Sequence, residues 1–341
     1  MYFKNYIFLP FFLFISNALM AQDLHFSQYY HHPLYQNPAL TGAMAEDFRV
    51  HAIYRSQWSS VPVPYRTFIS SFDTKLFTPR LKNTRVGVGG FLNTDRSGDS
   101  NFTTVQLGAS GSYGRMLQRG QWLSIGAQAY VNNHSLQPEN LTFDEQFNGE
   151  SFDESIAVTE IFERRNNTTL DVAVGINYHF DTKNTIANVG LSYVNFFKSA
   201  QPFLNRGTTA QLPKVNAYSG GRVWLSKLQG YSCGAFFSLQ GLGETEFVYR
   251  ETVIHAGWMY RLKRKDRADY ILHPGLHWRV GESLIPHLEL TYENWRVMLS
   301  YDITISDFRV ATQRRGGVEI GLRYVWKRVI PPPKSKACPV F

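Results

Sequence analysis

Three histidines near the N-terminus are the residues whose type and spacing first suggest chemistry. They are His25, His31 and His32. Imidazole nitrogens are common metal ligands, so this segment raises the question of a metal site. Adjacent histidines rarely bind the same ion, however, and no carboxylate or thiol stands at a spacing that would complete a ligand set. We therefore predict no metal and no cofactor here, and we favour a plug or docking role for the segment.

Acidic side chains and glycines give no catalytic arrangement either. Glu289 and Glu293 share one face of a predicted strand, but four residues of strand separate them by about 13 Å, which is wider than the spacing in carboxylate hydrolases. The chain has no GxSxG motif. The glycines at 108–111 and 316–317 lie in or beside predicted strands, where glycine more often relieves crowding than binds phosphate. We predict that the protein is not an enzyme.

Cysteine placement and charge exclude further classes of function. Cys233 lies on a predicted outward face and Cys338 lies in a tail that we expect in water, so we predict neither a disulfide nor a thiol metal site. The net charge is +8, but lysine and arginine occupy alternate strand positions and turns without a basic helix. We therefore predict no nucleic acid partner.

The elements that must position these side chains are strands in which apolar and polar residues alternate. The pattern is clearest in three consecutive predicted strands between Ser283 and Lys327. Because successive strand side chains point to opposite faces, each of these strands has one apolar face and one charged face. A soluble sandwich can show the same alternation, but a second sheet must then cover its apolar face.

The N-terminus favours export. Residues 1–21 contain Lys4, an apolar run from Ile7 to Ile15, and small residues from Ser16 to Ala21. These are the parts of a secretory signal peptide. The apolar run is too short to span a bilayer as a helix, which takes about 20 residues.

Export, alternating strands and an aromatic content of 15% together predict an all-β fold, a transmembrane antiparallel β-barrel in the cell outer membrane, in contact with outer-membrane lipid. We predict about fourteen strands, within a range of twelve to sixteen, and an even number is typical of such barrels. The predicted strands are 47–58, 64–75, 84–93, 101–116, 121–132, 168–180, 185–197, 212–225, 229–241, 245–262, 270–280, 283–293, 295–303 and 316–327.

The two faces of these strands give separate expectations. Leu299, Ile320, Leu322 and Tyr324 should face lipid. We expect mixed-sign side chains on neighbouring strands to face the lumen and to form a ladder of ion pairs. They are Glu289, Arg296, Asp302, Glu319 and Arg323.

The two ends of the chain are not explained by a barrel. We divide the chain into a signal peptide (1–21), an N-terminal periplasmic or plug segment (22–46), the barrel (47–327) and a periplasmic proline-rich tail (328–341). An even strand count places both ends on the periplasmic side. The side chains that we predict to bind a partner, or in the first segment to pack into the lumen, are Phe26, Tyr29, Tyr30, Tyr35, Asn37 and Pro38, and Cys338, Pro339 and Phe341 in the tail.

Several sequence pieces resemble one family. They are FSQYYHHPLYQNPALTG after the signal peptide, then YRSQW and SSFDTKL, then SYDITISDFRVATQRRGGVEIGLRY, and CPVF at the end. Together they resemble the PorP/SprF family of type IX secretion systems, over essentially the whole mature chain. The resemblance implies an outer-membrane barrel that serves protein export in Bacteroidota and, in gliding members, the export or anchoring of a surface adhesin.

The expected function is therefore a non-enzymatic barrel component of a secretion machine. Its partners would be periplasmic or outer-membrane subunits of the machine and a secreted cargo protein. The alternative is a porin-like or plugged outer-membrane transport channel. A passive pore needs neither the N-terminal segment nor the proline-rich tail, which favours partner binding.

Overall fold

The structure is a computed structural model. It describes residues 27–57, 65–76, 83–98, 100–141, 143–151, 153, 155–156, 165–198, 200–201, 209–241, 249–262, 270–307, 309–312 and 315–327. The predicted signal peptide, Phe26, and the tail with Cys338, Pro339 and Phe341 lie outside these residues.

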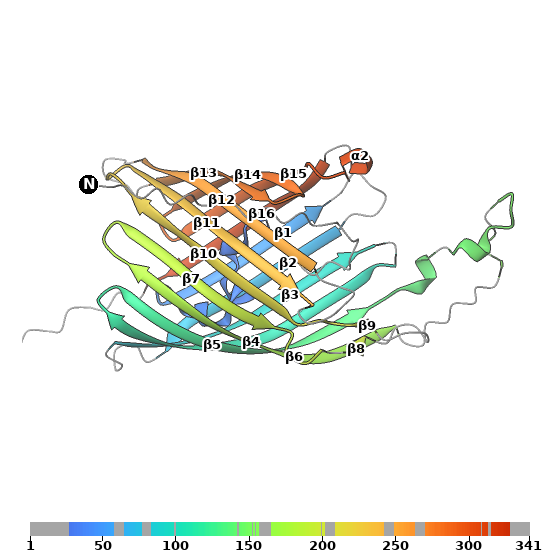
Figure 1. The fold of residues 1–341 in the computed structure, drawn as a ribbon, viewed down its shortest axis with the longest axis horizontal. Coiled ribbons are helices and arrows are strands. Elements are labelled where there is room, and N and C mark those ends of the chain that lie inside the picture. Colours follow the sequence, from blue (N-terminus) through green and yellow to red (C-terminus); the bar gives the residue numbers. More distant parts are fainter. Residues whose placement is uncertain are drawn as a thin grey trace, which may run out of the picture.

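Within the described residues, fourteen antiparallel strands close into a barrel in which β1 pairs with β16 (Figure 1). The predicted fold class is therefore confirmed. The strands are β1 (Phe48–Gln57), β2 (Tyr65–Leu76), β3 (Thr84–Ser97), β4 (Phe102–Gln118), β5 (Gln121–Ser135), β6 (Asn166–Asp181), β7 (Thr185–Val194), β10 (Lys214–Trp224), β11 (Gln229–Gln240), β12 (Tyr249–Leu262), β13 (Tyr270–Arg279), β14 (Ser283–Tyr292), β15 (Trp295–Thr304) and β16 (Arg315–Trp326).

Short elements occur in segments that the sequence indicates only as links. The strands β8 (Ala200–Gln201) and β9 (Thr209–Ala210) form a separate two-stranded sheet, and helix α2 (Arg309–Thr312) precedes β16. The link between β5 and β6 carries the 3-10 turns η3 (Pro138–Asn140) and η4 (Asp144–Gln146) and projects from one end of the barrel (Figure 1). Elements this short have no periodic pattern, so the sequence did not predict them.

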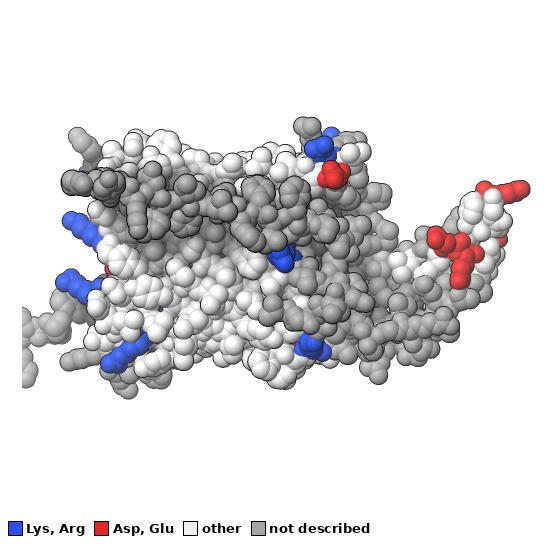
Figure 2. Space-filling model, viewed as in Figure 1, with Lys and Arg blue, Asp and Glu red and all other residues white. Residues whose placement is uncertain are grey.

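The outer face of the barrel is apolar. Leu299 and Ile320 are each 49% exposed, and the Cys233 side chain is also exposed. On the face drawn in Figure 2, most lysines and arginines lie near the two ends of the barrel. Acidic side chains gather on the projecting link. Such a surface matches a bilayer, where apolar side chains must face lipid and charged ones must reach the interfaces. Among the described residues, no helix is both long and apolar enough to cross a membrane.

The N-terminal residues Ser27–Gly42, here called the inner segment, lie inside the barrel as the blue coil of Figure 1. This segment consists of η1 (Tyr29–His31), α1 (Pro33–Gln36) and η2 (Pro38–Leu40). Proline begins α1 and η2, where its fixed φ suits a first turn and its missing N–H costs nothing. The side chains of His32 and Asn37 then cap these turns by accepting hydrogen bonds from the backbone N–H groups of Tyr35 and Ala39.

Candidate functional site

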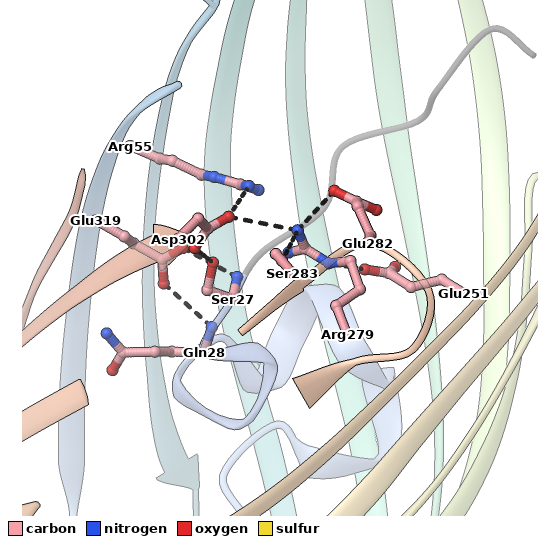
Figure 3. Close-up of polar contacts among 9 residues, drawn as sticks. All are labelled: Ser27, Gln28, Arg55, Glu251, Arg279, Glu282, Ser283, Asp302 and Glu319. Carbon is pink, nitrogen blue, oxygen red and sulfur yellow. Dashed lines mark hydrogen bonds and ion pairs between the residues drawn. The ribbon is translucent and has the colours of Figure 1, made fainter. Parts of the chain in front are cut away.

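The start of the inner segment is held by carboxylates of the last two strands (Figure 3). Glu319 on β16 accepts hydrogen bonds from the backbone N–H groups of Ser27, at 3.0 Å, and Gln28, at 3.2 Å. The Ser27 hydroxyl donates to Asp302 on β15 at 2.5 Å. Hydrogen bonds to an ionised acceptor are stronger than neutral ones, so this end of the segment is firmly bound.

Asp302 is also the centre of a buried ion-pair network (Figure 3). Its carboxylate accepts from Arg55 on β1 at 2.6 Å and from Arg279 on β13 at 3.4 Å. Arg279 donates as well to Glu251 on β12 and to Glu282, each at 3.0 Å. Side chains from four strands thus form one network of ion pairs inside the lumen. We call Arg55, Glu251, Arg279, Asp302 and Glu319, together with Glu289 on β14, the charged wall.

Aromatic and imidazole groups of η1 continue the contact along the charged wall. The Tyr29 ring stacks on Phe236 with ring centres 5.1 Å apart, and its hydroxyl is 2.9 Å from Nδ1 of His255. The Tyr30 hydroxyl donates to Oε1 of Glu289 at 2.7 Å, and Nε2 of His31 lies 2.8 Å from the same oxygen. Glu289 therefore binds two consecutive residues of the inner segment.

The opposite side of the lumen meets the segment through glycines rather than charges. We call Gly87 and Gly89 on β3, Gly126 on β5 and Gly175 on β6 the glycine wall. A Cβ at Gly126 would lie 2.4 Å from the Ala39 nitrogen, and one at Gly175 would lie 2.0 Å from Oδ1 of Asn37. Both distances are far inside van der Waals contact. The segment therefore packs directly on the backbone of this wall.

Polar contacts fix the middle of the segment against the same side. The Asn37 amide donates to the backbone carbonyls of Ile176 and Leu191, each at 3.0 Å. Tyr35 accepts a hydrogen bond from Nζ of Lys214 at 3.2 Å, and its ring contacts the cluster of Ile53 and Ile69. Pro38 is buried, and a Cβ at Gly126 would lie 2.4 Å from its carbonyl carbon.

The segment ends at another buried ion pair. Asp73 on β2 accepts from Arg49 on β1 at 2.9 and 2.7 Å, and from the Gly42 backbone N–H at 2.6 Å. Arg49 also donates to the Leu40 carbonyl at 3.2 Å. In contrast to these charged groups, His32 is neutral, because burial lowers the pKa of its imidazole to about 3.

The structure brings most of the sequence-predicted residues together. Tyr29, Tyr30, Tyr35, Asn37 and Pro38 all contact the inside of the barrel. The predicted lumen residues Glu289, Asp302 and Glu319 are each at most 2% exposed and bind the inner segment. Phe26 and the three predicted tail residues lie outside the described part of the chain.

The predicted ladder of ion pairs forms only in part. Among the described residues of that set, Arg296 and Glu289 pair with each other, at 3.4 Å, while Arg323 lies 3.8 Å from Glu46 instead. Asp302 pairs with the arginines of β1 and β13, and Glu319 binds backbone N–H groups. The prediction considered neighbouring strands only, whereas long side chains reach across the curved lumen and the inner segment supplies donors of its own.

Sequence reasoning missed the other half of the site. Arg49 and Arg279 were not singled out, and Arg55 and Asp73 appeared only within the family motifs YRSQW and SSFDTKL, because a charge at an inward strand position does not reveal its partner. The glycines were missed for a similar reason. A signal was nevertheless present in β3, where Gly87 and Gly89 stand two residues apart and therefore on one face. Repeated glycine on one face of a strand indicates that another backbone approaches closely.

Three solved barrels show the extent of structural likeness. The toluene transporter TbuX of Ralstonia pickettii has a TM-score of 0.48 at 10% identity, over 86% of this chain and 93% of that chain. A FadL homologue of Pseudomonas aeruginosa has a TM-score of 0.45 at 9% identity, over 85% and 93%. CdiB of Acinetobacter baumannii has a TM-score of 0.44 at 8% identity, over 82% and 60%. At these values none of them indicates a function for this chain.

Sequence comparison is more specific. The search of curated proteins gave no match. Residues 18–324 match the family described as type IX secretion system membrane protein PorP/SprF. The match spans nearly all of the barrel and the inner segment, and a closed barrel with an apolar outer face is the form that spans bacterial outer membranes. The chain therefore lies in the outer membrane and belongs to the PorP/SprF family of type IX secretion system membrane proteins.

Proposed function

We propose that the protein is a non-enzymatic component of a type IX secretion system and supports the export or anchoring of a secreted cargo, such as a gliding adhesin. In this role the barrel is a membrane anchor and docking platform, and the inner segment keeps the lumen closed. Periplasmic or outer-membrane subunits of the machine, and the cargo itself, are the partners.

The observation that carries this proposal is the binding of the inner segment to both sides of the lumen. Its start binds Asp302 and Glu319, and its middle packs on Gly126 and Gly175. A segment held by buried charges at one wall and by backbone contact at the other has few ways to leave. A passive pore gains nothing from such a segment, whereas a docking platform needs a sealed membrane.

Docking is proposed for the parts of the chain that lie beyond the barrel wall. The tail, including Cys338, Pro339 and Phe341, follows β16 at the end of the barrel where β1 begins, since Phe48 pairs with Trp326. Its prolines favour an extended form that binds partners with little loss of entropy. We assign this end to the periplasm, because the longest link, β5 to β6, lies at the other end.

An affinity pull-down tests the proposal. The full-length protein and a variant that ends at Arg328 would be expressed in the native host with the same tag and isolated from gently solubilised outer membranes. Heat-modifiable migration in electrophoresis would show that both barrels fold. We expect the full-length protein to recover machine subunits or a large exported cargo, and the truncated variant to recover less of them and to secrete less.

Two outcomes would contradict the proposal. Recovery of the full-length barrel alone, together with solute uptake that depends on it, would favour the transport-channel alternative. Normal secretion by a well-folded truncated barrel would remove the docking role from the tail and leave it to the projecting link.

A further inference from the structure

Two histidines and a glutamate meet on the lumenal face of β13 and β14. His273 stands directly opposite Glu289 in the register of these strands, and His287 precedes Glu289 by two residues. All three side chains therefore point to the same face. One ligand atom from each of His273, His287 and Glu289 lies within 4.8 Å of the other two.

One of the distances among these atoms is close to the separation of two ligands around a tetrahedral metal ion, and the other is longer. Nδ1 of His273 is 3.2 Å from Oε2 of Glu289, and Nε2 of His287 is 3.9 Å from Oε1. Metal–ligand bonds of about 2.0–2.1 Å at tetrahedral angles separate two ligands by roughly 3.3 Å. The His273–Glu289 distance already matches this value, whereas His287 would have to move about 0.6 Å closer to the carboxylate.

The imidazoles are held in place from behind. A Cβ at Gly275 would lie 2.3 Å from Cε1 of His287, and a Cβ at Gly257 would lie 2.4 Å from Nε2 of His273. Each ring thus rests on strand backbone that only glycine leaves open. Ser232 Oγ is 2.7 Å from Nε2 of His273, which leaves Nδ1 as the ligand atom that faces Glu289. A hydrogen bond to the second nitrogen is the usual support of a metal-binding histidine.

Two buried imidazoles at this place lack hydrogen-bond partners among the described residues. Neither nitrogen of His287 nor either nitrogen of His277 makes a hydrogen bond, and the two ring centres are 4.4 Å apart. His287 is 4% exposed and His277 is fully buried. A buried polar group without a partner is costly, so a ligand that satisfies the His287 nitrogen would stabilise the site.

We propose that His273, His287 and Glu289 bind one divalent transition-metal cation, for which Zn²⁺ is the best match. Two imidazoles and one carboxylate suit zinc, whereas Mg²⁺ and Ca²⁺ require sets of oxygen ligands. His273 binds through Nδ1 in the tautomer whose Nε2–H donates to Ser232, so no proton need leave that ring. Arg296, 3.4 Å from Oε2, releases Glu289 when the cation enters.

The site also lies against the inner segment. Nε2 of His31 and the hydroxyl of Tyr30 both contact Oε1 of Glu289. The carboxylate of Glu289 is one of the three proposed ligands. The cation therefore binds beside η1 and joins the barrel wall to the segment that fills it. The site does not depend on the secretion role, so the two proposals can fail separately.

The test is metal binding by the purified full-length protein, prepared without a polyhistidine tag and stripped with a chelator. Titration with Zn²⁺ should give one ion per chain, and Co²⁺ should give the visible absorption of a four-coordinate site. Mg²⁺ and Ca²⁺ should not compete. His273→Ala and His287→Ala should each lower Zn²⁺ affinity by more than about 100-fold, because removing a supporting second-layer partner alone costs 10–100-fold.

His134→Ala is the matched control. His134 is a buried lumenal histidine on β5, seven strands around the barrel from β14, so its loss should leave Zn²⁺ binding unchanged. If an imidazole variant does not fold, Ser232→Ala replaces it, with an expected loss of about 10–100-fold. Absence of saturable Zn²⁺ uptake by the folded wild-type protein would overturn the proposal, and so would unchanged uptake by folded His273→Ala and His287→Ala proteins.

Discussion

The charged wall and the glycine wall hold the same segment by opposite means. The charged wall presents long side chains, such as Arg55 and Arg279, that reach into the lumen and end in ion pairs. The glycine wall presents almost no side chain where it meets the segment, so the segment lies directly on strand backbone, with its own backbone at Gly126 and with the Asn37 side chain at Gly175. The first mode depends on a few atoms with large charges, and the second depends on the shape of the whole surface.

Because they bind differently, the two walls tolerate different substitutions. At the charged wall a conservative substitution can keep the shape and still leave a buried charge without its partner, which is expensive. At the glycine wall any side chain is too large, whatever its chemistry. Substitutions at equally buried positions, one that removes a charge and one that adds a methyl group, can therefore distinguish binding by ion pairs from binding by close packing.

The largest effect is expected at the centre of the charged wall. Asp302→Ala leaves Arg55 and Arg279 buried with too little negative charge, and it should lower the free energy of unfolding by about 3–5 kcal/mol. Urea unfolding in lipid vesicles, followed by tryptophan fluorescence, measures it. Glu139→Ala is the control, because the Glu139–Arg165 pair is exposed and should be worth about 0–1 kcal/mol. Equal losses in both variants would mean that the charged wall carries no special stability.

A smaller effect is expected at the glycine wall. Gly126→Ala places a methyl group against Ala39 and should cost about 1–3 kcal/mol, because the inner segment must move away. Chymotrypsin cleavage after Tyr29, Tyr30 or Tyr35 should rise in parallel. Gly111→Ala is the matched control, since the nearest atom to its new Cβ is 3.9 Å away. If Gly126→Ala behaved like Gly111→Ala, close backbone packing would not be what holds the segment.

The smallest effect is expected at an uncharged contact beside the charged wall, between Tyr29 and the side chains of Phe236 and His255. Tyr29→Phe keeps the ring on Phe236 and removes only the hydroxyl that meets His255, so it should cost about 0.5–1.5 kcal/mol. Tyr54→Phe, at an outer position that is 44% exposed, should change the free energy of unfolding by less than about 0.5 kcal/mol. A Tyr29→Phe loss as large as that of Asp302→Ala would contradict the view that the charged wall holds the segment more strongly than the neutral contacts beside it.

The sequence predicted the barrel well because the bilayer imposes a simple rule on it. Lipid on one side and a polar lumen on the other force alternation along every strand, so the outward positions of Leu299 and Ile320 could be inferred from their own strands. Fourteen strands and antiparallel pairing follow from the same pattern.

The contacts inside the barrel could not be predicted in the same way. That Asp302 pairs with Arg55, 247 residues away, depends on barrel closure and on the reach of the arginine across β16. The fit of Asn37 to Gly175 depends on the register of β6 and on the turns of the inner segment together. The histidines offer the same lesson, because the sequence drew attention to His25, His31 and His32, whereas the grouped ligand atoms belong to His273, His287 and Glu289.

Planar-bilayer recording can show whether the inner segment closes the lumen. The purified full-length protein would be compared with a variant in which a Gly-Ser linker of equal length replaces residues 27–42, after heat-modifiable migration has shown that both are folded. We predict no steady conductance from the full-length protein and a steady, open-channel conductance from the variant. A steady, porin-like conductance from the full-length protein, equal to that of the variant, would contradict closure of the lumen by the inner segment.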